Sequence, residues 1–403
     1  MRAFSFLFFF PLLLSAATIH TDFEGGSLGK IEQVSATHFR LAVRGESDQD
    51  GRNRQANWYY FRVDGASSQP LTLDIVDLPG EYNYKPNRGA ITKDTPPVIS
   101  YDGVHWTHIK SYQYDPAEPK LRLLIRPQSA RFWIAHVPPY TNRNLAKLRD
   151  EIGGNPNFNE EVIGKTVDGR NLQLWTITEG GAKGKPTIWL LFRQHSWETG
   201  SSWAGEGAVR TLLAANSESE QLRSRIVWKI FPLCDPDGVA RGGVRFNKYG
   251  FDLNRNWDVV DPVKMPEITA QRNAIRQWLK NGHDIKLLLT LHNTETGEYL
   301  EGPPDNGGAG KFKPLAERVF ELLIQETTFA PTRPLSFAEG TTTPGKKGRM
   351  TVVQGLYSEF GIPGFIMEQR ISYNAKLGHL PEIPDRLKFG GDLVRALGDA
   401  VLK

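Results

Sequence analysis

The sequence has a single cysteine, Cys234, among its 403 residues. One cysteine excludes an intramolecular disulfide and also excludes a zinc site built from thiolates. Any metal that the chain binds must therefore be held by histidine, aspartate or glutamate. Because Cys234 follows the apolar run 226–231, we expect it to be a small buried residue rather than a nucleophile.

A strong excess of one charge is absent as well. The 49 lysines and arginines and the 45 aspartates and glutamates leave a formal net charge of only +4. Nucleic-acid-binding domains usually carry a denser basic patch, so the composition does not favour nucleic acid as a partner. With 39% hydrophobic and 23% charged residues, the chain has the composition of an ordinary folded protein.

Long hydrophobic runs are missing except at the start of the chain. Arg2 precedes an apolar run over residues 4–14, and Ser15-Ala16-Ala17 supplies small residues after it. This order is typical of a secretory signal peptide, here residues 1–17, and the alternative is an uncleaved anchor. The run is short for a membrane span. We therefore expect an exported protein, periplasmic or secreted, without a stable membrane span.

The chain length and a change in pattern near residue 140 predict two domains. Before this point the sequence lacks segments of helical periodicity and instead has short runs rich in aromatic and β-branched residues, separated by turn residues. Such runs predict a smaller all-β sandwich domain over residues 18–139, with a β-barrel as the alternative. They are residues 39–43, 58–63, 71–76, 121–125 and 132–135.

From Thr141, a plausible helix N-cap, apolar runs alternate with segments of helical spacing. Nearly continuous apolar strands between helices predict an α/β domain over residues 140–403, with a mixed, mostly parallel central sheet flanked by helices. The expected strands are residues 187–192, 226–233, 285–291 and 364–367. The expected helices are residues 141–152, 204–214, 268–279, 315–325 and 384–402.

Polar residues follow these strands at the sheet edge where sites gather in α/β folds. His195 and Glu198 are three residues apart at a strand-to-helix turn, so both can face one point, and His292 ends another strand. Two histidines and a carboxylate, with a fourth position left for water, form the ligand set of a catalytic zinc site. The alternative is that both histidines are hydrogen-bonded residues at strand ends.

Glu368 ends a further apolar strand, where a carboxylate is costly unless it lies in a cleft or is paired. Beside a metal-activated water it would serve as general base and then general acid, whereas the alternative is an ion pair with Arg370. Arg245 could stabilise an oxyanion, and Arg255 with Asn254 could clamp a terminal carboxylate. The alternative for this segment is a surface turn with ordinary ion pairs.

Together these segments resemble the zinc carboxypeptidases of the M14 family. The order is His-x-x-Glu at 195–198, Asp-Pro-Asp-Gly at 235–238, Arg245, Asp-Leu-Asn-Arg-Asn-Trp at 252–257, His292 and Glu-x-Arg at 368–370. The first domain resembles the β-sandwich of the cytosolic carboxypeptidase subfamily in segments 58–63, 101–106 and 138–141.

The resemblance implies one Zn2+ on His195, Glu198 and His292, with Glu368 as general base and acid. It also implies that Arg245 polarises the carbonyl and that Asn254 and Arg255 hold the terminal carboxylate of the substrate. These roles coincide with the interpretation of the residues themselves.

Two features depart from the family. Ser196-Trp197 replaces the usual Pro-Gly between the metal ligands, and we expect the bulk of Trp197 to narrow the cleft. Digestive members carry a mobile tyrosine some twenty residues before the catalytic glutamate, where this chain has Gly345-Lys346-Lys347-Gly348-Arg349. Neither Tyr357 nor Tyr373 can be assigned that role.

The leading hypothesis is an exported zinc metallocarboxypeptidase that hydrolyses peptide or isopeptide bonds at peptide and protein C-termini. A second hypothesis is a related zinc amide hydrolase acting on cell-wall peptides or N-acyl amino acids. Lys346, Lys347 and Arg349 would then favour an acidic group, unless they are ordinary solvated loop charges. A non-catalytic binding module is the third, and the complete set of ligands, base and arginines argues against it. The sequence does not indicate the oligomeric state.

Overall fold

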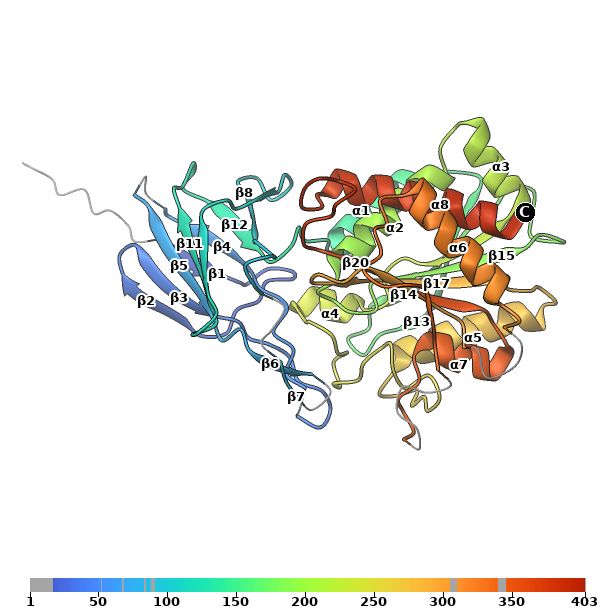
Figure 1. Cartoon of the computed structure of the whole chain (residues 1–403), viewed down its shortest axis with the longest axis horizontal. Helices are drawn as coiled ribbons and strands as arrows, with labels where there is room; N and C mark the ends of the chain where they lie inside the picture. The colour runs from blue at the N-terminus through green and yellow to red at the C-terminus, as the bar shows by residue number, and fades with distance from the viewer. Residues whose placement is uncertain are drawn as a thin grey trace, which may run out of the picture.

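A computed structural model describes residues 17–51, 53–66, 69–82, 85–87, 91–304, 310–339 and 346–402. A β-rich domain lies beside a larger α/β domain (Figure 1). We call the part before helix α1 (Asn142–Ile152) the β domain. The expected signal peptide falls outside the described residues, except for Ala17. No helix in the described part of the chain is long and apolar enough to cross a bilayer.

The β domain contains two five-stranded sheets within the described residues. Their inward residues, such as Phe61, Leu73, Leu123 and Ile134, are fully buried and form one core. Alternation of apolar and polar residues along β11 places Leu121, Leu123 and Ile125 inside, as expected for a strand with one buried face.

The first sheet has the order β1 (Thr18–His20), β4 (Tyr60–Asp64), β12 (Phe132–Ala135), β8 (Val98–Ser100) and β9 (Thr107–His108). The second has the order β10 (Tyr112–Asp115), β11 (Lys120–Ile125), β5 (Leu71–Val76), β3 (His38–Ala42) and β2 (Ile31–Ser35). A two-stranded ribbon pairs β6 (Gly80–Tyr82) with β7 (Lys85–Asn87).

The α/β domain is built on an eight-stranded sheet, counted over the described residues. Its four central strands, β16, β15, β17 and β20, run parallel, whereas β13, β14 and β18 join it antiparallel. This confirms the mixed, mostly parallel sheet predicted above. The order is β13 (Phe158–Lys165), β14 (Asn171–Ile177), β16 (Val227–Phe231), β15 (Thr187–Phe192), β17 (Leu287–Thr294), β20 (Gly364–Arg370), β18 (Tyr299–Gly302) and β19 (Ser336–Phe337).

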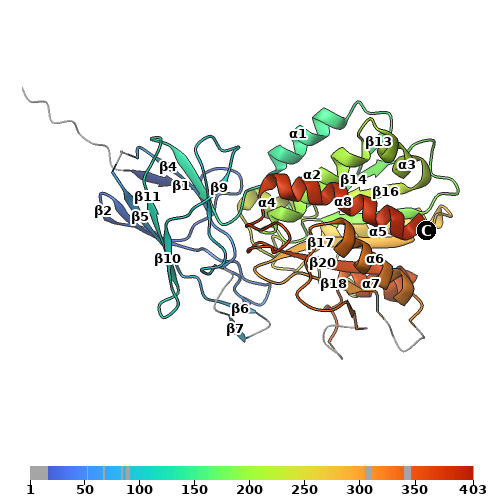
Figure 2. The same cartoon turned by 45° about the horizontal axis from the view of Figure 1, so that its top comes forward.

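Helices cover both faces of this sheet (Figure 2). One face packs on α1, α2 (Thr199–Leu212), α3 (Ser217–Arg225), α6 (Lys313–Glu326) and α8 (Ile383–Leu402). The other packs on α5 (Pro266–Lys280) and α7 (Val352–Phe360). Along β15, Leu190 contributes to the first core and Trp189 to the second, which explains why the central strands are apolar throughout. The short helix α4 (Pro236–Arg241) follows β16.

Candidate metal centre

His195 and Glu198 lie in the loop between β15 and α2, where the chain leaves the sheet. Arg193 begins this loop with a positive φ of 63°, a conformation that is uncommon outside glycine. Its buried guanidinium holds the loop, because Nε donates to the carbonyl of Ser196 at 2.8 Å and Nη1 to Oγ of Ser202 at 3.0 Å. The loop therefore presents both predicted ligands from a fixed backbone.

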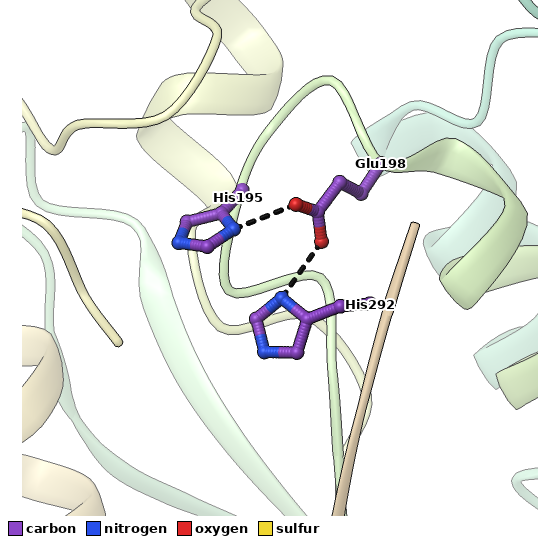
Figure 3. A group of neighbouring side chains, drawn as sticks. All are labelled: His195, Glu198 and His292. Atoms are coloured by element: carbon purple, nitrogen blue, oxygen red, sulfur yellow. Dashed lines mark hydrogen bonds and ion pairs between the residues drawn. The ribbon is translucent and has the colours of Figure 1, made fainter. Parts of the chain in front are cut away.

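The three predicted metal ligands come together in the structure (Figure 3). Nδ1 of His195 lies 2.7 Å from Oε1 of Glu198, and Nδ1 of His292 lies 2.8 Å from Oε2. One ligand atom from each residue falls within 4.8 Å of the others, and all three residues are buried. Two imidazole nitrogens and a carboxylate that converge in this way fit Zn2+. Although burial opposes ionisation, the two histidines hold the pKa of Glu198 well below its ordinary value.

A second group of residues orients the ligands, as is common around metal-binding histidines. Nε2 of His195 lies 3.0 Å from Oδ1 of Asp252, whose Oδ2 accepts a hydrogen bond from Nε of Arg245 at 2.8 Å. Nε2 of His292 lies 3.1 Å from Oε1 of Gln194. Burial raises the pKa of Asp252, but Arg245 and His195 lower it by more than burial raises it. The pKa of Asp252 therefore lies well below its usual range. Sequence reasoning assigned no role to Asp252 or Gln194.

Glu368 lies beside His292, because the two residues are direct partners on the parallel strands β17 and β20. Its Oε2 is buried and has no hydrogen-bond partner among the described residues. Burial and the carboxylate of Glu198 raise its pKa well above the ordinary value. The alternative ion pair with Arg370 is not formed, since Nε of Arg370 lies 3.2 Å from Glu298 instead.

A cavity of about 230 Å3 opens next to this centre between the two domains. The α/β domain lines it with Arg245, Arg255, Lys346, Lys347 and Arg349 among other residues, and the β domain lines it with Asp48, Asp50, Asn53 and Gln55. The two predicted arginines thus share one cavity. Nε of Arg255 is buried and has no hydrogen-bond partner within the described part of the chain.

Asn254 is placed differently from the arginines. It does not line the cavity. Its Oδ1 accepts a hydrogen bond from the backbone of Val352 at 3.1 Å, and its Nδ2 lies 3.3 Å from Nε2 of His292. Its neighbour Asn256, which sequence reasoning did not single out, does line the cavity. Contact between Asn254 and a substrate carboxylate stays a prediction.

The expectation that Trp197 narrows the cleft is wrong. Trp197 is only 3% exposed. Its indole packs in a buried cluster that is formed largely by the β domain and includes Trp58, Tyr60 and Val137. The ring of His136 stacks on it with centroids 5.9 Å apart and an angle of 14°. Sequence reasoning could not anticipate this, because the neighbours of Trp197 come from the other domain.

Both parts of the chain match known protein families. Residues 148–301 match the zinc carboxypeptidase family of M14 peptidases, and residues 19–136 match the cytosolic carboxypeptidase N-terminal domain. Cytosolic carboxypeptidase 6 of Mus musculus is 30% identical over 71% of this chain and 55% of its own length. An uncharacterised protein of Zymomonas mobilis is 29% identical over 71% of each chain.

The chain spans 63% of cytosolic carboxypeptidase 6 of Caenorhabditis elegans and 32% of cytosolic carboxypeptidase 3 of Bos taurus. Among solved structures, the metallo-carboxypeptidase of Burkholderia cenocepacia superposes with a TM-score of 0.80 at 22% identity, covering 96% of this chain and 99% of that one. The metallo-carboxypeptidase of Pseudomonas aeruginosa has the same TM-score and identity, covering 95% and 100%. The two matched domains and the converging His195, Glu198 and His292 lead to one assignment: the chain contains an M14 zinc carboxypeptidase domain, preceded by a cytosolic carboxypeptidase N-terminal domain.

Proposed function

We propose that the protein is a zinc-dependent metallocarboxypeptidase that hydrolyses the C-terminal peptide or isopeptide bond of a peptide or protein. The observation that carries the proposal is the position of Glu368. Its Oε2, which has no hydrogen-bond partner among the residues that the structure describes, lies one strand away from the ligand His292, at the centre formed by His195, Glu198 and His292. A buried carboxylate without a partner is costly in a fold unless it is used.

The residues divide the chemistry between them. His195, Glu198 and His292 would hold Zn2+, which when bound would supply a Lewis acid to polarise the scissile carbonyl and acidify water. Glu368, the strand partner of the ligand His292, accepts the proton of the attacking water and then delivers it to the leaving amine. Arg245 offers N–H donors to the developing oxyanion. Arg255, whose buried Nε has no hydrogen-bond partner in the described part of the chain, offers planar donors to a terminal carboxylate.

Glu368→Gln tests this assignment. The amide cannot take a proton from water, so we expect hydrolysis to fall by about 10²–10⁴-fold while zinc content stays at one ion per chain. Peptide digestion read by mass spectrometry, with and without a chelator, measures the release of C-terminal residues and its metal dependence together.

The matched control is Glu359→Gln on α7. Glu359 pairs with Arg272 and Arg276 and does not line the cavity, so this variant should hydrolyse peptides like the wild type. Full activity of Glu368→Gln would contradict the mechanism. Wild-type activity that survives complete removal of zinc would contradict the metal assignment.

A second candidate is a related amide hydrolase that selects acidic substrates, such as cell-wall peptides or N-acyl amino acids. Its support is the group of Lys346, Lys347 and Arg349 in the lining of the cavity. A panel of peptides that differ only in the last residue, assayed beside cell-wall peptides and N-acyl amino acids, separates the two candidates. Preference for a cell-wall peptide or an N-acyl amino acid would favour the second.

We also propose that the protein is exported, to the periplasm or the medium. The support is the sequence alone, namely Arg2, the apolar run 4–14 and the small residues 15–17. Export of a reporter fused behind residues 1–17 tests it, and a reporter that stays inside the cell would refute it.

A further inference from the structure

One segment of the β domain, Arg44-Gly45-Glu46, contacts the loop 241–250 of the α/β domain, which carries Arg245. Oε2 of Glu46 accepts hydrogen bonds from three successive backbone N–H groups, those of Val244 at 3.0 Å, Arg245 at 2.6 Å and Phe246 at 2.8 Å. Oε1 of Glu46 accepts a fourth, from Nη2 of Arg241 at 2.7 Å. A carboxylate with four donors is a strong, directional anchor.

Arg44 holds the same loop through its carbonyl groups. Its Nη2 donates to the backbone oxygens of Arg241 at 2.9 Å and Gly242 at 2.8 Å. The base of the segment is itself fixed, because Glu46 and Gln55 exchange two backbone hydrogen bonds of 2.8 Å. We call Arg44 and Glu46 the clasp. The cation of Arg44 donates hydrogen bonds to backbone carbonyls of the loop, and the anion of Glu46 accepts hydrogen bonds from its backbone amides.

Two glycines of this loop, Gly242 and Gly250, lie close to the backbone of the β domain. A Cβ at Gly242 would lie 2.5 Å from the backbone oxygen of Gly26, and a Cβ at Gly250 would lie 2.4 Å from the backbone nitrogen of Gln49. Both glycines also have positive φ, 64° and 83°, which other residues rarely adopt. The close approach of the two backbones therefore depends on glycine at these positions.

Two residues, Arg245 and Asp252, connect the clasp to the metal ligand His195. Arg245, whose backbone Glu46 holds, donates from Nε to Asp252, and Asp252 contacts the ligand His195. We propose that Glu46 is a positioning residue that acts through Arg245, so that the β domain completes the active site of the α/β domain. The proposal rests on the function proposed above, in which Arg245 stabilises the oxyanion. A stabilising group displaced by about 1 Å can cost about 10²-fold in rate.

Glu46→Gln tests the proposal in the full-length zinc enzyme. Glutamine keeps the size of the side chain, but one of its two terminal atoms becomes a donor that faces other donors. We expect kcat to fall by about 10–100-fold with KM within threefold of wild type, because the oxyanion contact is made in the transition state. Zinc content should stay at one ion per chain.

The matched control is Glu24→Gln. Glu24 is also a β-domain carboxylate that holds the other domain, but it accepts from the backbone and side chain of Asn142 at the start of α1, at 3.0 and 2.8 Å. This variant should keep wild-type kcat. An equal loss in both variants would show that any damage to the interface lowers the rate, and would overturn the proposal.

A double-mutant cycle with Arg245→Ala isolates the route of action. Once the guanidinium is gone, adding Glu46→Gln should change kcat by less than twofold. An undiminished loss in the Arg245→Ala background would overturn the proposal. If Glu46→Gln does not fold, Arg44→Gln replaces it in the same cycle and must meet the same criterion.

Hydrogen exchange supplies a readout that does not depend on hydrolysis. The backbone amides of residues 244–246 should be protected in the wild type and should exchange at least tenfold faster in Glu46→Gln but not in Glu24→Gln. Unchanged protection would refute the clasp. A wild-type protein that releases no C-terminal residue would instead refute the proposed function, so the two failures can be told apart.

Discussion

At the scale of single residues, the metal centre is asymmetric. His195 is held by a carboxylate, Asp252, whereas His292 is held by the amide of Gln194. Asp252 also holds Arg245, so one side chain fixes both a metal ligand and the group that faces the reacting carbonyl. Binding of zinc and alignment of the arginine should therefore respond together to a change at Asp252.

Asp252→Asn should weaken zinc binding by about 10–100-fold, which is the usual effect of losing the partner of a metal-binding histidine. The amide keeps the shape but loses the negative charge that accepts a hydrogen bond from the Nε2–H group of His195, which fixes the tautomer and orientation of the ring and strengthens Nδ1 as a ligand. Competition with a chromogenic chelator measures the affinity. Asp50→Asn is the control, because Asp50 lines the same cavity but is exposed. Equal zinc affinity in both variants would contradict this account.

The sequence could indicate which residues carry chemistry but not how they are held. His195, His292 and Glu368 follow apolar runs, and the strand ends of a parallel sheet share one edge. Gln194 is an ordinary polar residue in sequence, and its contact with His292 exists only after two strands have paired. Glu46 gave no signal either, since its partners lie about two hundred positions away in the chain.

At the scale of elements, the packing of α2 against α8 decides where Glu198 lies, because α2 begins directly after that ligand. The two helices touch through their backbones. A Cβ at Gly207 of α2 would lie 1.9 Å from the carbonyl oxygen of Leu387, and a Cβ at Gly390 of α8 would lie 1.8 Å from that of Ala204. Such separations leave no room for a side chain.

Gly390→Ala should therefore destabilise the protein by about 1–3 kcal/mol, as overpacking usually does. The intrinsic preference of helices points the other way, because alanine is favoured over glycine by about 1 kcal/mol. Gly154→Ala is the control, since a Cβ there meets nothing within 4 Å. Urea denaturation measures both changes, and a Gly390→Ala variant as stable as the wild type would contradict the packing argument.

Most elements with a strong apolar pattern could be predicted. The expected helix after Thr141 is α1, and the expected strands 187–192 and 285–291 correspond to β15 and β17. Strand β14 and helix α7 have buried apolar residues and were nevertheless missed. Other missed elements lack such a pattern. Strand β13 is Phe-Asn-Glu-Glu-Val-Ile-Gly-Lys and largely faces solvent, and helix α3 is Ser-Glu-Ser-Glu-Gln-Leu-Arg-Ser-Arg with one apolar residue. Their places are set by neighbours rather than by their own sequences.

At the scale of the whole molecule, the β domain contacts three of the segments that carry the site. Trp197 lies between the ligands His195 and Glu198, Val244 precedes Arg245, and Ile371 directly follows strand β20, which carries Glu368. These three apolar residues belong to one buried cluster with residues of the β domain. At the edge of this cluster burial lowers the pKa of His136 to about 4, so the ring that stacks on Trp197 stays neutral near pH 7.

A cluster shared in this way links the folding of the two domains. Opening either domain alone would expose Trp197 and its neighbours to water, at a cost of about 25 cal/mol for each Å2 of apolar surface. We therefore expect a single calorimetric transition for the metal-free chain, with the van't Hoff enthalpy close to the calorimetric enthalpy. Trp197→Ala should separate it into two, whereas two transitions in the wild type would contradict the idea. The indole that takes the place of the usual Pro-Gly would then make the chain melt as one cooperative unit rather than as two domains in sequence.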